Sequence, residues 1–185
     1  MKFYSVFDPE FKAYGQVVSG MDDTIEELLE AMKLLPENVE LWFTGGGNAA
    51  EDIAAAAQAD SRIKLFGFLP SRDELLEKQH EADCLISTRR PQEPASAYCF
   101  PSKLFEYMIS GNPVISTRIL GIPEEYFDHL IPLDSIAPEE IARCIRRVAD
   151  MPSEVREKIG KEGRAFVLEK KSNTAQCARI LEFIK

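Results

Sequence analysis

The sequence predicts one α/β domain built around a doubly wound parallel sheet with helices on both faces. Strand-like and helix-like segments alternate five or six times along the 185 residues, as expected of parallel strands joined by crossover helices. Hydrophobic residues make up 45% of the chain and charged residues 29%, which suits a globular protein with its own core. No repeat or linker divides the chain, so we expect a lead-in segment over 1–14, the sheet domain over 15–168 and a C-terminal helix over 169–185.

The first half of the chain supplies three predicted strands. Three short runs rich in β-forming side chains predict them, and each ends at a glycine or a loop: 16–19 (QVVS), 39–44 (VELWFT) and 62–66 (RIKLF). Apolar side chains that recur at helical spacing predict the helices of this half, at 22–35, around 53–57 and at 73–81. Pro36 ends the first of these helices.

The second half repeats the alternation and ends in helices. Its predicted strands are 83–87 (DCLIS), 113–116 (PVIS) and a short one at 129–132. A helix over 101–110 has proline in its first turn, where the missing N–H has no cost, and Gly111-Asn112 closes it. The polar, proline-bearing stretch 88–97 predicts a loop, and further helices are expected at 138–149, 152–168 and 172–185.

Charge and composition exclude several classes of partner. There are 22 Lys and Arg against 31 Asp and Glu, a formal net charge of −9, so nucleic acid and anionic membrane surfaces are poor partners. The N-terminus lacks the pattern of a signal peptide, and no stretch approaches the ~20 apolar residues of a membrane span. The four cysteines form no CxxC pair, which indicates a reducing cytoplasm, and no cluster of metal ligands is evident.

In such sheets ligands bind beyond the carboxyl ends of the strands, so the residues that follow each strand are the informative ones. Gly45, Gly46 and Gly47 follow the strand VELWFT, and they allow either close approach of a ligand or simply a tight turn. They match neither the dinucleotide fingerprint nor a Walker A loop. The loop Phe66-Gly67-Phe68-Leu69 has backbone groups that could meet a planar base, and a plain hydrophobic turn is the alternative.

A third segment, CFPSKLFEYMISGNPVIS at 99–116, is the most informative. The helix start at Ser102 offers free amides and a positive dipole end to an anion, and Lys103 adds a charge there. Glu106, one turn further, could accept hydrogen bonds from a vicinal diol such as a ribose. Alternatively, Ser102 only caps the helix while Lys103 and Glu106 form a solvated pair. A fourth segment, with Arg118 followed by LGIPEEY, is a weaker border for a ligand.

Five segments occur along the chain in this order: FTGGGN, RIKLFGFLP, ADCLIS, FPSKLFEYMISGNPVIST and GIPEEYF. Together they resemble the C-terminal domain of family 4 retaining glycosyltransferases, especially those that build bacterial capsular and exopolysaccharides. The resemblance implies one Rossmann-like half of a GT-B enzyme, in which this half binds a UDP- or GDP-sugar and the other binds a glycan or lipid-linked acceptor. It implies that no metal or other cofactor is needed.

The resemblance also implies roles for individual residues. Glu106 matches the second glutamate of the family's E-x7-E motif, which binds the donor ribose. Phe100, Pro101, Ser102 and Lys103 match the loop and helix start at the diphosphate and sugar. The segments 45–47 and 66–69 match those that line the phosphates and base.

Three departures bear on activity. Tyr98 stands where the first glutamate of E-x7-E is expected, which leaves Glu93 as the carboxylate that could reach the sugar if its loop folds inward. The stretch 20–24 (GMDDT) lacks the cations that the family places after the first strand, so Lys103, helix amides and Arg118 would have to stabilise the leaving group. No residue is a certain catalyst; Lys103 and Glu93 are the candidates.

The third departure is the missing second half, which makes the chain a fragment of a longer enzyme or one subunit of a split enzyme. The C-terminal helix carries an apolar face (Cys177, Ile180, Leu181 and Ile184) for that half or for its own domain. A non-catalytic nucleotide-sugar-binding module remains the alternative function, while the absence of a nearby acid–base pair argues against a nucleotide-sugar 2-epimerase. The expected location is the cytoplasm, either free or held at the inner face of the membrane through the missing half.

Overall fold

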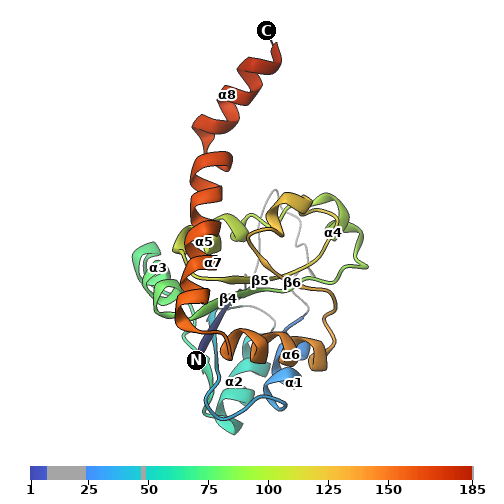
Figure 1. Ribbon diagram of the computed structural model, residues 1–185. Helices are drawn as coiled ribbons and strands as arrows, with labels where there is room; N and C mark the ends of the chain where they lie inside the picture. The colour runs from blue at the N-terminus through green and yellow to red at the C-terminus, as the bar shows by residue number, and fades with distance from the viewer. Residues whose placement is uncertain (8–23, 47–48, 185) are drawn as a thin grey trace.

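The computed structural model describes residues 1–7, 24–46 and 49–184, which form a six-stranded parallel sheet covered by helices on both faces (Figure 1). The strands are β1 (Lys2–Phe7), β2 (Glu40–Gly45), β3 (Ile63–Leu65), β4 (Cys84–Ser87), β5 (Val114–Thr117) and β6 (Ile131–Leu133). Their order is β3-β2-β1-β4-β5-β6, and every neighbouring pair is parallel. The predicted fold class, a Rossmann-like doubly wound sheet, is confirmed.

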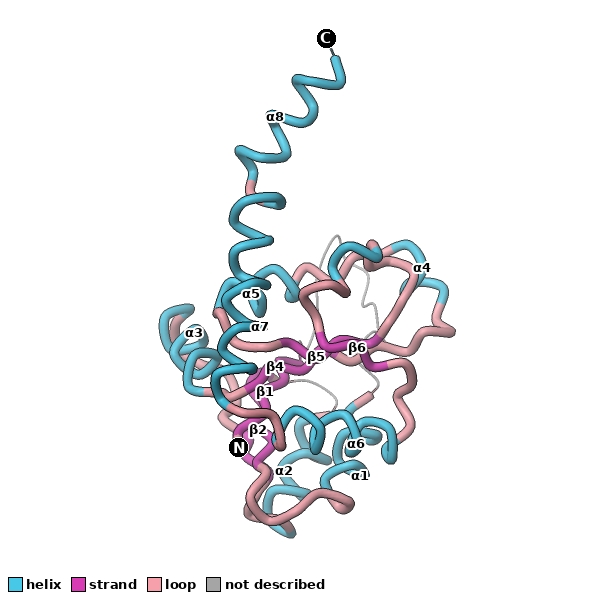
Figure 2. Tube along the Cα trace, viewed as in Figure 1, coloured by secondary structure: helices cyan, strands magenta, loops and turns pink. Residues whose placement is uncertain are grey.

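The helices form two layers. Those of the first layer are α1 (Ile25–Met32), α2 (Ala50–Ala59) and α6 (Pro138–Ala149); those of the second are α3 (Arg72–Glu81), α5 (Lys103–Ser110) and α7 (Ser153–Phe166). The chain continues from α7 through a π-helical turn, η2 (Val167–Lys171), into α8 (Asn173–Ile184), which projects away from the sheet (Figure 2). The short elements α4 (Pro94–Tyr98) and η1 (Glu124–Tyr126) lie in the loops that follow β4 and β5.

The alternation of side chains along the strands explains why two layers form. In β2, Leu41 and Phe43 are buried in the core that contains the apolar faces of α1 and α6, whereas Trp42 between them belongs to the core beneath α5. Leu85 in β4 also joins the α5 core, opposite to its neighbours on the strand. Because successive strand residues point to opposite faces, an unbroken apolar run such as LWF can serve both cores.

The N-terminal segment differs from the prediction. The lead-in expected over 1–14 contains β1, which pairs with β2 from Lys2 to Phe7 and with β4 through Phe3 and Tyr4. It therefore lies in the middle of the sheet. The strand predicted at 16–19 falls outside the described residues.

Two further corrections concern the segment before β5. The loop predicted over 88–97 contains the start of α4, which Pro94 can begin because its missing N–H has no helical partner there. The helix predicted from Pro101 begins at Lys103, and it ends as expected at Gly111, whose φ of 81° suits a glycine. A Cβ on Gly160 of α7 would lie 1.9 Å from the Gly111 carbonyl oxygen, so this end of α5 is pressed directly onto α7.

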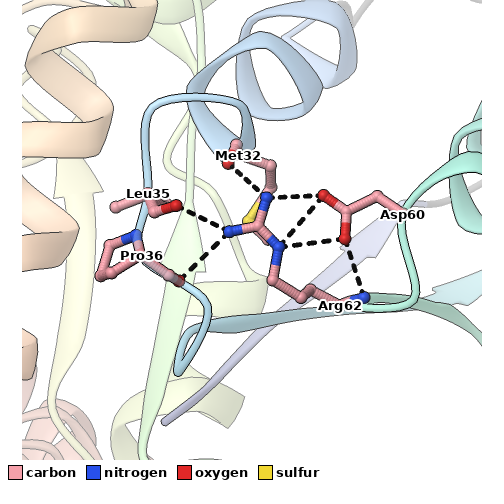
Figure 3. A network of polar contacts seen from close by, with 5 residues as sticks. All are labelled: Met32, Leu35, Pro36, Asp60 and Arg62. Atoms are coloured by element: carbon pink, nitrogen blue, oxygen red, sulfur yellow. Dashed lines mark hydrogen bonds and ion pairs between the residues drawn. The ribbon is translucent and has the colours of Figure 1, made fainter.

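A network of polar contacts around Arg62 ties β3 to the turn after α1 (Figure 3). The guanidinium donates to the carbonyl oxygens of Met32, Leu35 and Pro36 at 3.0, 2.7 and 3.1 Å. It also forms an ion pair of 2.6 Å with Asp60, and this partner holds the pKa of the Asp60 carboxyl below its usual range. Arg62 thus supplies side-chain donors to carbonyl groups at the end of α1 and in the turn that follows it.

We expect Arg62→Met to lower the free energy of unfolding by about 2–4 kcal/mol, because it removes the ion pair with Asp60 and the guanidinium hydrogen bonds to three carbonyl groups. The measurement is urea denaturation at neutral pH. The control is Lys33→Met, which removes an exposed ion pair with Glu30 at 2.6 Å and should cost about 0.5 kcal/mol or less. Equal, small effects of the two substitutions would show that the network does not stabilise the fold.

Candidate functional site

The topology fixes where a crevice opens. Strand order runs outward in opposite directions from β1, so the connections after β1 and β4 leave on opposite faces of the sheet. The carboxyl ends of these two neighbouring strands are the switch point where doubly wound sheets bind ligands. The residues that follow β2, β4 and β5 lie along the same edge.

Polar contacts join the segments on either side of the switch point. The hydroxyl groups of Thr24, just before α1, and Thr88, just after β4, are 2.6 Å apart and buried. Arg90 forms an ion pair of 2.7 Å with Glu27 in the first turn of α1. The backbone N–H of Arg89 donates to Thr117 Oγ1 at 3.1 Å, which ties this segment to the end of β5 as well.

The structure brings together two of the predicted segments, those after β2 and β3. Gly45 has a φ of 112° and donates its N–H to the Gly67 carbonyl oxygen at 2.8 Å. A Cβ on Gly46 would lie 2.6 Å from Cε2 of Phe68, so the absence of a side chain at Gly46 makes room for that ring. The ring is nevertheless 73% exposed and forms a free apolar surface beside the glycine turn. Gly47 lies outside the described residues.

The other residues of the 66–69 loop have different surroundings. Phe66 packs edge-on against Trp42 with ring centroids 5.3 Å apart, and the Lys78 ammonium lies 5.1 Å from its ring. Leu69 is half-buried. Phe66 therefore anchors the loop to the sheet through Trp42, and Phe68 has the more exposed ring of the two.

The start of α5 presents its backbone and one cation. Ser102 is exposed and makes no side-chain cap, and Lys103 is the first, half-buried residue of the helix. Phe100 packs against Phe105 and Tyr126 with centroid distances of 4.8 and 5.0 Å, so its ring belongs to the core. Pro101 is buried. At 100–101, only the backbone is left to face a ligand.

Glu106 lies one turn into α5 and is half-buried between helices. Its Oε1 accepts a hydrogen bond of 2.5 Å from Nε2 of Gln79, a residue of α3 that is fully buried. No ion pair joins Glu106 to Lys103 among the residues the structure describes. The solvated pair weighed for these two residues is therefore not formed here.

Arg118 and Glu93 lie on the β5 side of the site. The Arg118 guanidinium forms ion pairs of 2.5 Å with Glu124 and 3.4 Å with Asp134, and it lies 4.3 Å from the ring centre of Phe127. Its charge is therefore shared between two carboxylates. Glu93 is half-buried at the turn before α4, and this segment is fixed to the loop after β5 by the hydrogen bond from Gly121 N–H to the Ser96 carbonyl at 2.8 Å.

Sequence reasoning missed Arg89 and Arg90. The resemblance predicts cations after the first strand, whereas these two arginines follow the fourth strand, at the switch point. The signal was present in the run DCLISTRR, in which two arginines come directly after a buried strand. Gln79 gave no comparable signal.

A family model described as glycosyl transferases group 1 matches residues 11–151 of the chain. The chain belongs to this family. The match includes every strand except β1 and takes in the glycine turn, the Phe68 loop and α5. No curated protein matches the chain significantly.

Several solved structures share the fold at low sequence identity. The HepE protein of Anabaena, solved in complex with UDP-glucose, is 16% identical with a TM-score of 0.68; the match covers 99% of this chain and 48% of HepE. The C-terminal domain of the group 1 glycosyltransferase LpcC from Francisella tularensis is 17% identical with a TM-score of 0.70, covering 93% of this chain and 86% of that domain. WaaG, a glycosyltransferase of lipopolysaccharide biosynthesis, is 18% identical with a TM-score of 0.62, covering 89% of this chain and 42% of WaaG.

The chain thus spans about half the length of HepE and of WaaG. Within the described ranges, no helix has the length and apolar character needed to cross a membrane. Residues 1–7, 24–46 and 49–184 contain no group of three or more His, Cys, Asp or Glu side chains placed to hold a metal ion.

Two glycines at this edge should respond differently to an added methyl group. In Gly121→Ala the Cβ would lie 2.5 and 2.9 Å from the carbonyl oxygens of Cys99 and Ser96, so backbone must move, and we expect a loss of about 2 kcal/mol or more. In Gly46→Ala the nearest atom belongs to the exposed Phe68 ring, which can swing away at a cost of about 1 kcal/mol or less. Thermal denaturation of both variants measures this, and an equal loss in the two would refute the proposed tight contact of α4 with the loop after β5.

Proposed function

We propose that the chain is the donor-binding half of a family 4 retaining glycosyltransferase of the GT-B type, active in capsular or exopolysaccharide synthesis. It holds a UDP- or GDP-sugar at the carboxyl edge of the sheet for transfer of the sugar to a glycan or lipid-linked acceptor. The main support is that the glycine turn, the Phe68 ring and the cationic start of α5 follow β2, β3 and β4 along one edge, as a nucleoside diphosphate requires. The UDP-glucose in the related fold of HepE favours a uridine nucleotide.

The chemistry of each side chain suggests its place. The base stacks on Phe68 beside the backbone of the 66–69 loop, since an exposed ring next to a glycine turn accepts a flat aromatic ligand. The carboxylate of Glu106 accepts hydrogen bonds from the ribose hydroxyl groups. Lys103 and the first amides of α5 meet the diphosphate, and Arg89 at the switch point supplies a second cation.

Catalysis in this proposal depends on stabilising the departing diphosphate, without a metal ion. Lys103 and Arg89 provide the positive charge that the leaving group needs. Glu93 reaches the sugar only if the segment before α4 moves inward. Tyr98, at the position of the family's first glutamate, is 87% exposed and brings no carboxylate to the sugar.

We further propose that the chain alone does not turn over and needs a second half, on the same or another polypeptide. In α8, which projects from the sheet, no residue is buried, and Ile180, Leu181, Phe183 and Ile184 are 57%, 62%, 91% and 73% exposed (Figure 1). Such a face suits a partner domain that binds the acceptor. The alternative is a non-catalytic module that binds the donor, and Tyr98 is the residue that favours it. Glycosyltransferase activity that appears when a partner subunit is added would support the enzyme hypothesis over the non-catalytic alternative.

Calorimetric titration with UDP, GDP and ADP, with EDTA present, tests the donor site. We expect one nucleotide to bind saturably in the micromolar range (roughly −6 to −8 kcal/mol). Glu106→Ala should weaken that binding by about 1–3 kcal/mol, because it removes charged hydrogen bonds to the ribose. Unchanged affinity in a folded Glu106→Ala variant would remove this residue from the site, and binding that requires a divalent metal ion would contradict the metal-free proposal.

Substitutions of Lys103 and of Arg118 should also differ in their effect on nucleotide affinity. Lys103→Met is expected to reduce nucleoside diphosphate affinity about tenfold or more, because a cation at the helix start meets the phosphates. Arg118→Met should change the affinity by about twofold or less, since the Arg118 charge is already shared between Glu124 and Asp134. The same titration measures both, and the reverse order would place the diphosphate on the β5 side of the edge.

A further inference from the structure

Gln79 is an unusual residue for its position. It is the buried residue of α3 and is 0% exposed, although glutamine side chains are mostly found at protein surfaces. Its backbone is held as well, because its carbonyl oxygen accepts a hydrogen bond of 2.9 Å from Nδ2 of Asn112 in the turn before β5. The backbone of Gln79 is therefore held in place, and its side chain is shielded from solvent.

One end of the Gln79 amide is bound and the other is not. Nε2 donates to Glu106 Oε1 at 2.5 Å, whereas Oε1 of Gln79 is buried with no hydrogen-bond partner among the residues described. Turning the amide over would place Oε1 against the carboxylate, where two acceptors repel each other. The Glu106 carboxylate thus fixes the orientation of the Gln79 amide. In this orientation Oε1 of Gln79 has no hydrogen-bond donor among the described residues.

Fold stability does not explain this arrangement. A buried acceptor without a partner is destabilising, and an apolar side chain of similar size, such as methionine, would remove it. Asn112, a half-buried residue in the neighbouring turn, shows that this region can provide partners for an amide, since its Nδ2 also donates to the Ala82 carbonyl oxygen at 2.8 Å. A buried polar atom left without a partner beside a candidate ligand-binding carboxylate is typical of a residue that serves a site.

We propose that Gln79 is a positioning residue that orients the Glu106 carboxylate for the ribose diol of the donor, an inference that rests on the proposed function. A carboxylate oxygen accepts at more than one position, so the bond from Gln79 leaves Oε2 and the remaining lone pair of Oε1 for two hydroxyl groups. A glutamate side chain without this hydrogen bond would lose rotamer freedom when the ribose binds. The bond from Gln79 restricts the Glu106 rotamer before binding, so this entropy cost is reduced. Gln79 touches no ligand itself in this arrangement.

The test compares nucleotides that differ only in the diol. The 185-residue chain, its Gln79→Met and Glu106→Ala variants and the surface control Glu77→Met are titrated calorimetrically with UDP and 2′,3′-dideoxy-UDP, and with GDP and 2′,3′-dideoxy-GDP. Glu77 lies on the same helix and is exposed. Thermal denaturation of each variant shows that it is folded.

We expect the unaltered chain and Glu77→Met to prefer the ribose form at least about tenfold, and Gln79→Met to lose most of that preference through weaker binding of the ribose form alone. Affinity for the dideoxy form should stay within about twofold, which a merely structural defect would not produce. If Glu106→Ala loses the preference while Gln79→Met keeps it, the role given to Gln79 is wrong and the proposed function stands. If Glu106→Ala keeps the preference, or no nucleotide binds, the proposed donor site is wrong and the role of Gln79 with it.

Discussion

The pairing of β1 with β2 on one side and β4 on the other is the constraint on which the molecule depends. It joins the half of the sheet that carries Gly45 and Gly67 to the half that carries α5, and it places the change in strand order at the centre. Without β1 these halves would be a two-stranded sheet (β3-β2) and a three-stranded sheet (β4-β5-β6) with unpaired edges, and no crevice would lie between them. The position of the proposed donor site therefore depends on the hydrogen bonds of one short strand.

The site is made mainly of backbone and of contacts between loops. Gly45 is bonded to Gly67, Thr24 to Thr88 and Arg89 to Thr117, so each segment at the carboxyl edge is held by a segment after another strand. This arrangement suits an acidic protein with a formal net charge of −9, which cannot attract a diphosphate by its overall field. In the proposed function, a few cations and helix amides at one edge attract the diphosphate locally.

The sequence was sufficient for the fold class and for most elements, because hydrophobic period and turn residues are local signals. It was insufficient for β1, since the pairing of Lys2 with Glu40 is long-range and the run at 16–19 looked equally strand-like. Arg89 and Arg90 are visible in the sequence directly after a strand-like run, but the resemblance predicts cations after the first strand instead. The burial of Gln79 is not predictable from the sequence, because α3 has little amphipathic pattern and the residue is enclosed through tertiary packing that includes α5.

An NMR titration that follows backbone amide shifts as UDP or GDP is added is the sharpest test of the donor site. Perturbations confined to the glycine turn after β2, the 67–69 loop, the segment after β4 and the first turn of α5 are predicted, and they should saturate together. Shifts centred on α6, α8 or the amino ends of the strands, with the carboxyl edge unchanged, would contradict a nucleotide-sugar site at the β1–β4 switch point.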